Sequence, residues 1–278
     1  MTVVEAPPPL PVRDTARHRA PDQGARDTTG GGLSPMLTRL AAERATGVLV
    51  REGGALYLAD GLVLHAESPY APGIGTLLTA SGAVPAEEWW TAAGTAGDLP
   101  GTARLLLAGG GLTRAALEIC HLHALYDAAY FALAPSSSPG RFHYGPPPEA
   151  DGPLPAVPVA AVEREVLRRR ALLHRLWPDA LLDGVPLLRT APVAAPGVTA
   201  RQAAVLALAD GVRTAPDIAL AQGRRVFPTL VEVRRLVAAG LLGTPPPPPA
   251  AAAPPSAPPD IDPHIALLKR VRDALEAL

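Results

Sequence analysis

The chain has 278 residues, and its 25 basic side chains nearly balance 26 acidic ones, which leaves a formal net charge of −1. A protein with so little net charge has no overall field that would attract nucleic acid or an anionic membrane. The one cysteine, Cys120, excludes an intramolecular disulfide and any zinc site built from several cysteines.

The N-terminal segment does not have the pattern of a signal peptide, because Glu5 and a run of prolines stand where an apolar core is needed. The most apolar stretch, residues 105–134, is interrupted by charged side chains and histidines. A membrane-spanning helix tolerates few such residues, so this stretch predicts a buried helix. We therefore expect a cytoplasmic protein with no membrane span.

The 34 prolines and 26 glycines gather at the start of the chain, around residues 135–158 and at 243–259. Segments of this kind hold too few apolar side chains to offset the entropy that is lost on ordering. The predicted units are a disordered N-terminus (1–32), an α+β domain (33–146), a Pro-rich linker (147–158), a connecting helix with a separate all-α helix-turn-helix-like domain (159–243), a Pro/Ala linker (244–259) and an amphipathic C-terminal helix (260–278).

The α+β domain begins with a short helix, for which Ser34 is a suitable cap, Pro35 a suitable first residue and Gly47 a plausible stop. Next come three short apolar runs, separated by Gly53-Gly54 and by Asp60-Gly61. Both dipeptides favour the positive φ angles of tight hairpins. We therefore expect an antiparallel meander of three strands between residues 47 and 66, with helices packed against its two apolar faces.

A weak internal repeat follows the meander. Residues 75–82 and 104–110 each read as a short helix that ends at a glycine, and a new helix begins after each. The second copy leads into a long helix from Thr113 to about Leu133. The alternating segment Arg141–Tyr144 then predicts a last strand of the sheet.

The second unit opens with an amphipathic helix over residues 159–177, and three helices follow within about 45 residues. Thr199 and Thr214 open capping boxes for the first two of these helices, and the third runs over about 228–239. Helix, helix, Gly-containing turn and helix is the outline of a helix-turn-helix unit.

The C-terminal segment 260–278 places apolar side chains on one stripe of a helix. Such a short helix is not stable alone, so we expect it to dock on the body or on a partner. Self-association through 159–177 or 260–278 is the alternative to a different partner. The stripe consists of Ile265, Leu268, Val271, Leu275 and Leu278.

Residues 33–146 resemble the PATAN domain, a bacterial family also catalogued as domain of unknown function 4388. The resemblance lies in the helix 35–43, in Thr46–Val50, in Asp60-Gly61 before a strand that ends at His65-Ala66, and in the closing Gly140–Tyr144. It implies a protein-interaction or signalling-adaptor module with no established enzymatic activity. The three-helix unit is similar to the winged-helix segments that accompany this domain.

DNA binding through the three-helix unit is the alternative function. It would place helix 228–239 in a major groove, with Thr229, Glu232 and Arg235 outward. Arg224, Arg225 and Arg234 could then reach phosphates. Residues 197–243 contain six arginines against three acidic residues, a net charge of about +3, and Glu232 would itself repel phosphate.

Trp89 and Trp90 are neighbours on a predicted helix, so only one of the two rings can enter the core. The other is a candidate contact for a protein partner, because exposed tryptophans often mark contact surfaces.

Catalytic and metal sites are not expected. Cys120 and His123 are three residues apart and so lie on one side of a helix. The further ligands that a metal ion needs are missing nearby in the sequence. The sequence contains neither a Gly-x-Ser-x-Gly elbow nor a phosphate-binding loop with its lysine. The sequence therefore predicts a regulatory adaptor that acts through protein contacts and needs no cofactor, with a DNA-binding transcriptional regulator as the alternative.

Overall fold

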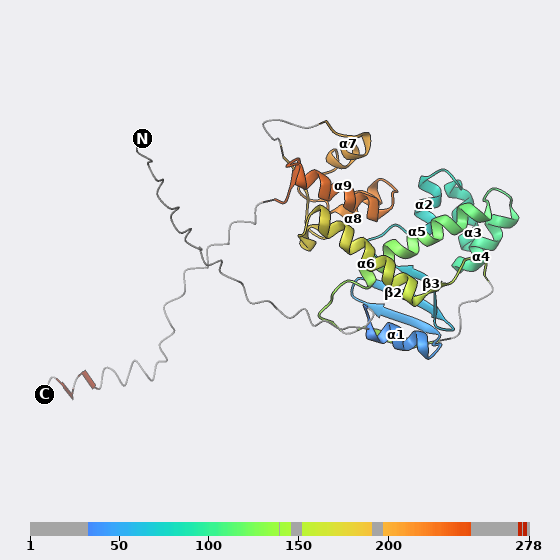
Figure 1. The fold of residues 1–278 in the computed structure, drawn as a ribbon, viewed down its shortest axis with the longest axis horizontal. Coiled ribbons are helices and arrows are strands. Elements are labelled where there is room, and N and C mark those ends of the chain that lie inside the picture. The colour runs from blue at the N-terminus through green and yellow to red at the C-terminus, as the bar shows by residue number, and fades with distance from the viewer. Residues whose placement is uncertain are drawn as a thin grey trace, which may run out of the picture.

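The computed structural model describes residues 33–138, 140–145, 152–190 and 197–245, together with 272, 273, 275 and 276 (Figure 1). Helices and strands alternate in the mixed order of an α+β protein. In chain order they are α1 (Pro35–Ala42), β1 (Gly47–Arg51), β2 (Gly54–Ala59), β3 (Leu62–Glu67), α2 (Ile74–Ala80), α3 (Ala86–Ala96), α4 (Leu99–Ala108), α5 (Arg114–Ala132), β4 (Arg141–Tyr144), β5 (Val157–Pro158), α6 (Val159–Leu176), the 3₁₀ turn η1 (Ala180–Asp183), β6 (Leu188–Arg189), α7 (Ala200–Leu206), α8 (Ala215–Ala221), α9 (Val226–Ala238) and β7 (Leu242–Gly243).

The predicted meander is confirmed. β1, β2 and β3 pair antiparallel, and β4 and β5 extend the sheet to the order β4-β1-β2-β3-β5. Asp60 and Gly61 both adopt positive φ, 51° and 77°, as a tight hairpin requires. Arg44 donates two hydrogen bonds to the Asp60 carboxylate, of 2.6 and 2.5 Å, and so ties the end of α1 to this turn.

Helices cover the sheet as expected, but only one face is fully buried. Leu49, Leu56 and Ala66 align across three strands on the face that packs into the core. The neighbouring positions Val48 and Tyr57 are only half-buried on the opposite face. The second face is therefore covered less completely than the first, and the expectation that both faces are covered holds fully for one of them only.

The internal repeat corresponds to real structure. α2 ends before Gly82 and α4 before Gly110, and both glycines have positive φ, of 72° and 74°. Thr113 caps the long helix α5 as expected. Ser34 also caps α1, but this helix ends at Ala42, and the expected stop Gly47 is instead the first residue of β1.

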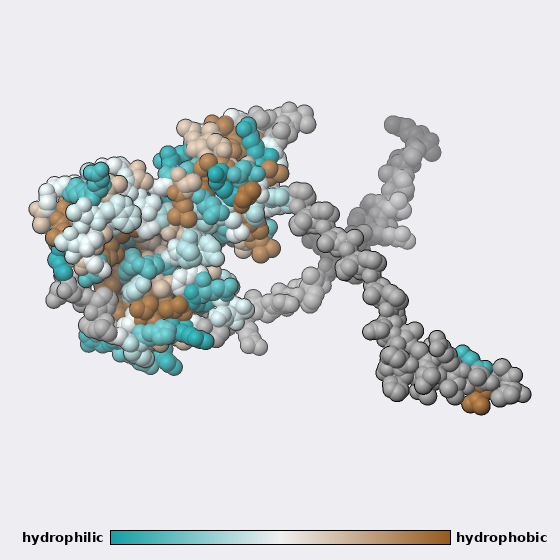
Figure 2. Space-filling model, turned by 180° about the vertical axis from the view of Figure 1, so that it is seen from behind, coloured by the Kyte–Doolittle hydropathy of each residue, from teal (hydrophilic) through white to brown (hydrophobic). Residues whose placement is uncertain are grey.

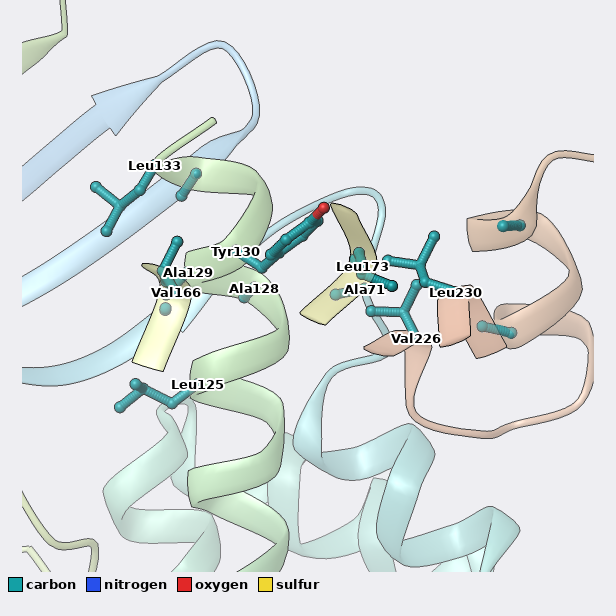
Figure 3. Close-up of a cluster of buried hydrophobic side chains, with 14 of the residues drawn as sticks. Ala71, Leu125, Ala128, Ala129, Tyr130, Leu133, Val166, Leu173, Val226 and Leu230 are labelled. Atoms are coloured by element: carbon teal, nitrogen blue, oxygen red, sulfur yellow. The ribbon is translucent and has the colours of Figure 1, made fainter. Parts of the chain in front are cut away.

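The hydrophobic core does not divide at the predicted linker 147–158. One cluster, which we call the main core, contains side chains of α1, the sheet, α5, α6 and all three helices α7–α9. Figure 3 shows Leu125 and Tyr130 of α5, Leu173 of α6 and Leu230 of α9 in this shared cluster. A second cluster, the α2–α4 cluster, lies among α2, α3, α4 and the first half of α5.

The helix-turn-helix-like region carries β-structure of its own. β6 pairs antiparallel with β7, and Leu188 also bridges to Asp210. β6 precedes α7 and β7 follows α9, so this pair joins the two ends of the three-helix region. The capping boxes of α7 and α8 are confirmed, whereas the third helix begins at Val226, two residues earlier than predicted.

Most of the predicted C-terminal helix, including Ile265, Leu268 and Val271, lies outside the described residues, as does the predicted disordered N-terminus 1–32. Leu275 is described and is exposed. Within the described ranges, the longest apolar helices still fall short of what a bilayer crossing requires.

Candidate functional site

The helix expected to read DNA, α9, is buried on most of its circumference. Thr229 is 5% exposed and Arg234 is 2% exposed, so the expectation that Thr229 faces outward and that Arg234 reaches phosphate is wrong. Arg235 is exposed and pairs with Glu232 at 3.0 Å. Leu230 and Val233 face inward as predicted. A helix that reads base edges needs a free face, and α9 presents little of one.

Arg234 is bound inside the molecule. Its guanidinium donates to the carbonyl oxygens of Trp177 and Asp179, the latter at 2.7 Å, and forms an ion pair with Asp183. The Tyr130 hydroxyl donates to the same Asp183 carboxylate at 2.6 Å. Burial, reinforced by Asp183, raises the pKa of the Tyr130 phenol above its ordinary value. This network joins α5, η1 and α9.

A second buried network holds the N-terminus of α9. Asp127 of α5 is 1% exposed and forms a 2.6 Å ion pair with Arg169 of α6. The other oxygen of Asp127 accepts hydrogen bonds from the backbone amides of Val226 and Phe227, at 2.9 and 3.4 Å. A carboxylate at this position satisfies free amides of the first turn and complements the helix dipole. Arg169 also stacks over the Phe227 ring, 4.5 Å from its centroid.

The remaining arginines of the DNA hypothesis lie together. Arg224 and Arg225, with Arg201 of α7, line a cleft of about 530 Å³ between α5 and the α8–α9 turn. Cys120 and His123 of α5 line the same cleft. Burial raises the pKa of the Cys120 thiol, which the nearby Arg225 partly offsets. Burial and then Arg225 lower the pKa of His123. The structure thus places Cys120 and His123 beside cationic groups, where a metal cation would be repelled.

One of the two neighbouring tryptophans is buried and the other is exposed, as the sequence predicts. Trp89 is 8% exposed and its ring lies against Gly75, where an added Cβ would come within 2.4 Å of it. Trp90 is 70% exposed. Both line a groove of about 810 Å³ that runs between α3 and the strand ends, with His65 and Thr76 also on its wall. On the face seen in Figure 2, hydrophobic side chains form small patches that hydrophilic ones separate.

Two histidines near the groove form a pair that the sequence did not predict. His65 of β3 and His121 of α5 stack with their ring centroids 6.1 Å apart. Burial, with His65 as a further cause, lowers the pKa of His121 to about 4. Neither ring nitrogen of His121 makes a hydrogen bond of ordinary geometry to any described residue. No pattern along the chain signals this pair, because it depends on how α5 crosses β3.

The apolar stripe of the connecting helix is used within the molecule. Val159, Val162, Val166 and Leu173 are buried in the main core and are not free for a partner. In the part of the chain that the structure covers, no group of three histidine, cysteine or acidic side chains could hold a metal ion. Comparison of the chain with protein-family models, with curated proteins and with solved structures finds no match.

Proposed function

We propose that the chain is a non-enzymatic regulatory adaptor of the bacterial cytoplasm that acts through protein–protein contacts. The resemblance of residues 33–146 to the PATAN family implies this role. The observation that carries it is Trp90, a large aromatic side chain that is 70% exposed on the wall of an 810 Å³ groove. Tryptophan is one of the residue types enriched among the side chains that dominate binding energy at interfaces.

In this proposal, α7–α9 serve as a winged-helix-like packing module instead of a DNA-reading one. The burial of α9 and the Asp127 carboxylate at its N-terminus support that assignment, since a major-groove helix uses its N-terminal residues to contact bases. The main core, which runs continuously from the sheet to α9, supports a relay of contacts between the two regions.

The test compares the partners that cross-link in cells to the wild-type chain and to two variants. Trp90→Ala is expected to lose at least one cross-linked partner because it removes the exposed ring. Ile119→Ala is the matched control, since Ile119 is also exposed, at 55%, but does not line the groove. An identical set of partners for Trp90→Ala and the wild type would contradict the proposed contact surface.

A further inference from the structure

The cleft between α5 and the α8–α9 turn is a built feature of the fold. Gly223 in that turn has φ 58°, and an added Cβ would meet the Ala80 side chain of α2 at 2.3 Å. The turn is therefore pressed against the end of α2, and the cleft of about 530 Å³ opens beside this contact. Asp127 also fixes the start of α9, because it accepts a hydrogen bond from the Val226 amide.

The charges of this cleft are unbalanced. Arg201, Arg224 and Arg225 form no ion pair with any acidic side chain of the described ranges. The other three arginines of the same region are all paired, with Asp210, Asp183 and Glu232. The one carboxylate that lines the hollow, that of Glu232, already pairs with Arg235, so the three arginines leave the hollow with a net positive charge that favours an anion.

The cleft also offers an acceptor. Glu232 lines it and pairs one carboxylate oxygen with Arg235, whereas the other oxygen is buried without a hydrogen-bond partner among the described residues. A buried acceptor without a donor is unfavourable, so a ligand that brings a hydroxyl or amine to it is favoured. Leu77, Val205 and Pro228 supply apolar wall for the body of such a ligand.

Size and shape favour a small molecule over a nucleic-acid duplex. A volume of about 530 Å³ falls within the usual range for small-molecule sites. The arginines line a concave hollow, whereas a duplex presents its phosphates on a convex surface. Guanidinium groups bind phosphate oxygens bidentately, which suits three arginines around one phosphate.

We propose that this cleft binds a small phosphorylated molecule. Arg201, Arg224 and Arg225 hold the phosphate, and the free oxygen of Glu232 accepts a hydrogen bond from a hydroxyl or amine of the same ligand. This site is independent of the Trp90 groove, so its failure in a test leaves the adaptor proposal standing, and the reverse holds as well.

Cys120 provides a reporter within the cleft, because it is the one cysteine of the chain. The full-length protein is alkylated with iodoacetamide, a neutral reagent, at increasing concentrations of inorganic pyrophosphate or AMP, and the rate is followed by mass spectrometry. A bound phosphate covers the thiol and cancels the field of Arg225, so the alkylation rate is expected to fall with saturation. Calorimetry with the same two probes measures the affinity directly.

The variants are Arg224→Gln and Arg225→Gln, with Arg114→Gln as the control, since Arg114 is exposed on α5 and pairs with Glu118 away from the cleft. Each cleft variant is expected to weaken the affinity about tenfold, the loss of one charge-assisted hydrogen bond. Glu232→Gln is expected to weaken AMP, whose hydroxyls can donate, more than pyrophosphate. Circular dichroism checks that each variant is folded.

Four outcomes overturn the proposal. The first is that neither probe gives saturable heat in calorimetry or saturable protection of Cys120 from alkylation, and the second is that sodium chloride at matched ionic strength protects Cys120 equally. The third is that the cleft variants bind the probes as tightly as the control. The fourth is that citrate or a DNA duplex protects Cys120 more strongly than pyrophosphate and AMP do. Saturable binding that only the cleft variants weaken supports it.

Discussion

The main core and the α2–α4 cluster are organised by different interactions. The helices of the main core are also linked by the buried ionic groups Asp127, Arg169 and Arg234, whose partners lie far away in the chain. The α2–α4 cluster is made of apolar side chains, and the Trp89 ring packs there so closely on Gly75 that no Cβ fits between them. Directional ion pairs specify which helix ends meet, whereas apolar packing specifies shape and volume. The two regions should therefore fail in different ways when each is altered.

Removal of the Asp127 carboxylate is expected to have the largest effect. Asp127→Ala leaves Arg169 buried without its partner on α5 and leaves the first amides of α9 without their acceptor. Breaking a buried ion pair from one side costs about 3–5 kcal/mol of unfolding free energy. Urea denaturation measures this loss.

The control for Asp127 is Arg39→Ala, which breaks an exposed pair with Glu43. Exposed pairs of this kind contribute less than about 1 kcal/mol. A cost for Asp127→Ala no greater than that for Arg39→Ala would show that the buried network does not hold α9.

Acidification is expected to weaken the contact between α5 and β3. The pKa of His121 is about 4 in the folded chain, below its ordinary value of 6.5, so the unfolded chain binds the proton more readily. The contribution of neutral His121 to the free energy of unfolding is therefore complete above pH 6.5. It is lost as the pH falls toward 4, by up to about 3 kcal/mol.

Urea denaturation between pH 7.5 and 4.5 checks this dependence against His121→Gln. The neutral glutamine cannot gain a proton, so its stability should fall less across that range than the wild type does. His65, whose ring stacks on that of His121, and Glu67 are unchanged in the variant. Parallel pH profiles would show that His121 carries no such linkage.

A pair of glycine substitutions tests the apolar region. Gly75→Ala places a Cβ within 2.4 Å of the Trp89 ring and is expected to cost about 1–3 kcal/mol through overpacking. Gly94→Ala, on α3, meets open space and is expected to stabilise the helix by about 0.5–1 kcal/mol. Thermal unfolding should show that the two substitutions shift the melting temperature in opposite directions from that of the wild type. A shift of the same sign for both would mean that the Trp89 contact adapts freely.

The smallest signal is expected in a test of DNA binding. A mobility-shift assay of the full chain with genomic fragments across a salt series should give no sequence-selective complex, because α9 is buried. A tight selective complex that Arg235→Ala weakens would favour the transcriptional regulator over the adaptor.

Local signals explain why much of the fold could be predicted. Asp60-Gly61, the Ser34 cap and the capping boxes at Thr199 and Thr214 act over a few residues, and each lies where the sequence indicates. The division of Trp89 and Trp90 also follows from helical geometry, since adjacent side chains on a helix point in different directions.

The candidate site was less predictable. The orientation of α9 was predicted from its own periodicity, which correctly placed Leu230 on the inner side. That periodicity could not reveal that Thr229 and Arg234 are buried as well. The partners of Arg234 lie more than 50 residues away, and Asp127 lies 99 residues from Val226. Nothing in the order of residues marks pairs at such separations.

By itself, the sequence determined the turns, the caps and the helix and strand segments of this protein, because these depend on side chains within about one helical turn of each other. Only the tertiary structure decided which of its arginines are neutralised inside the molecule and which remain free in a cleft. The physical reason is that a charge is paired or left alone by whatever helices pack against it, and that packing is a property of the whole core.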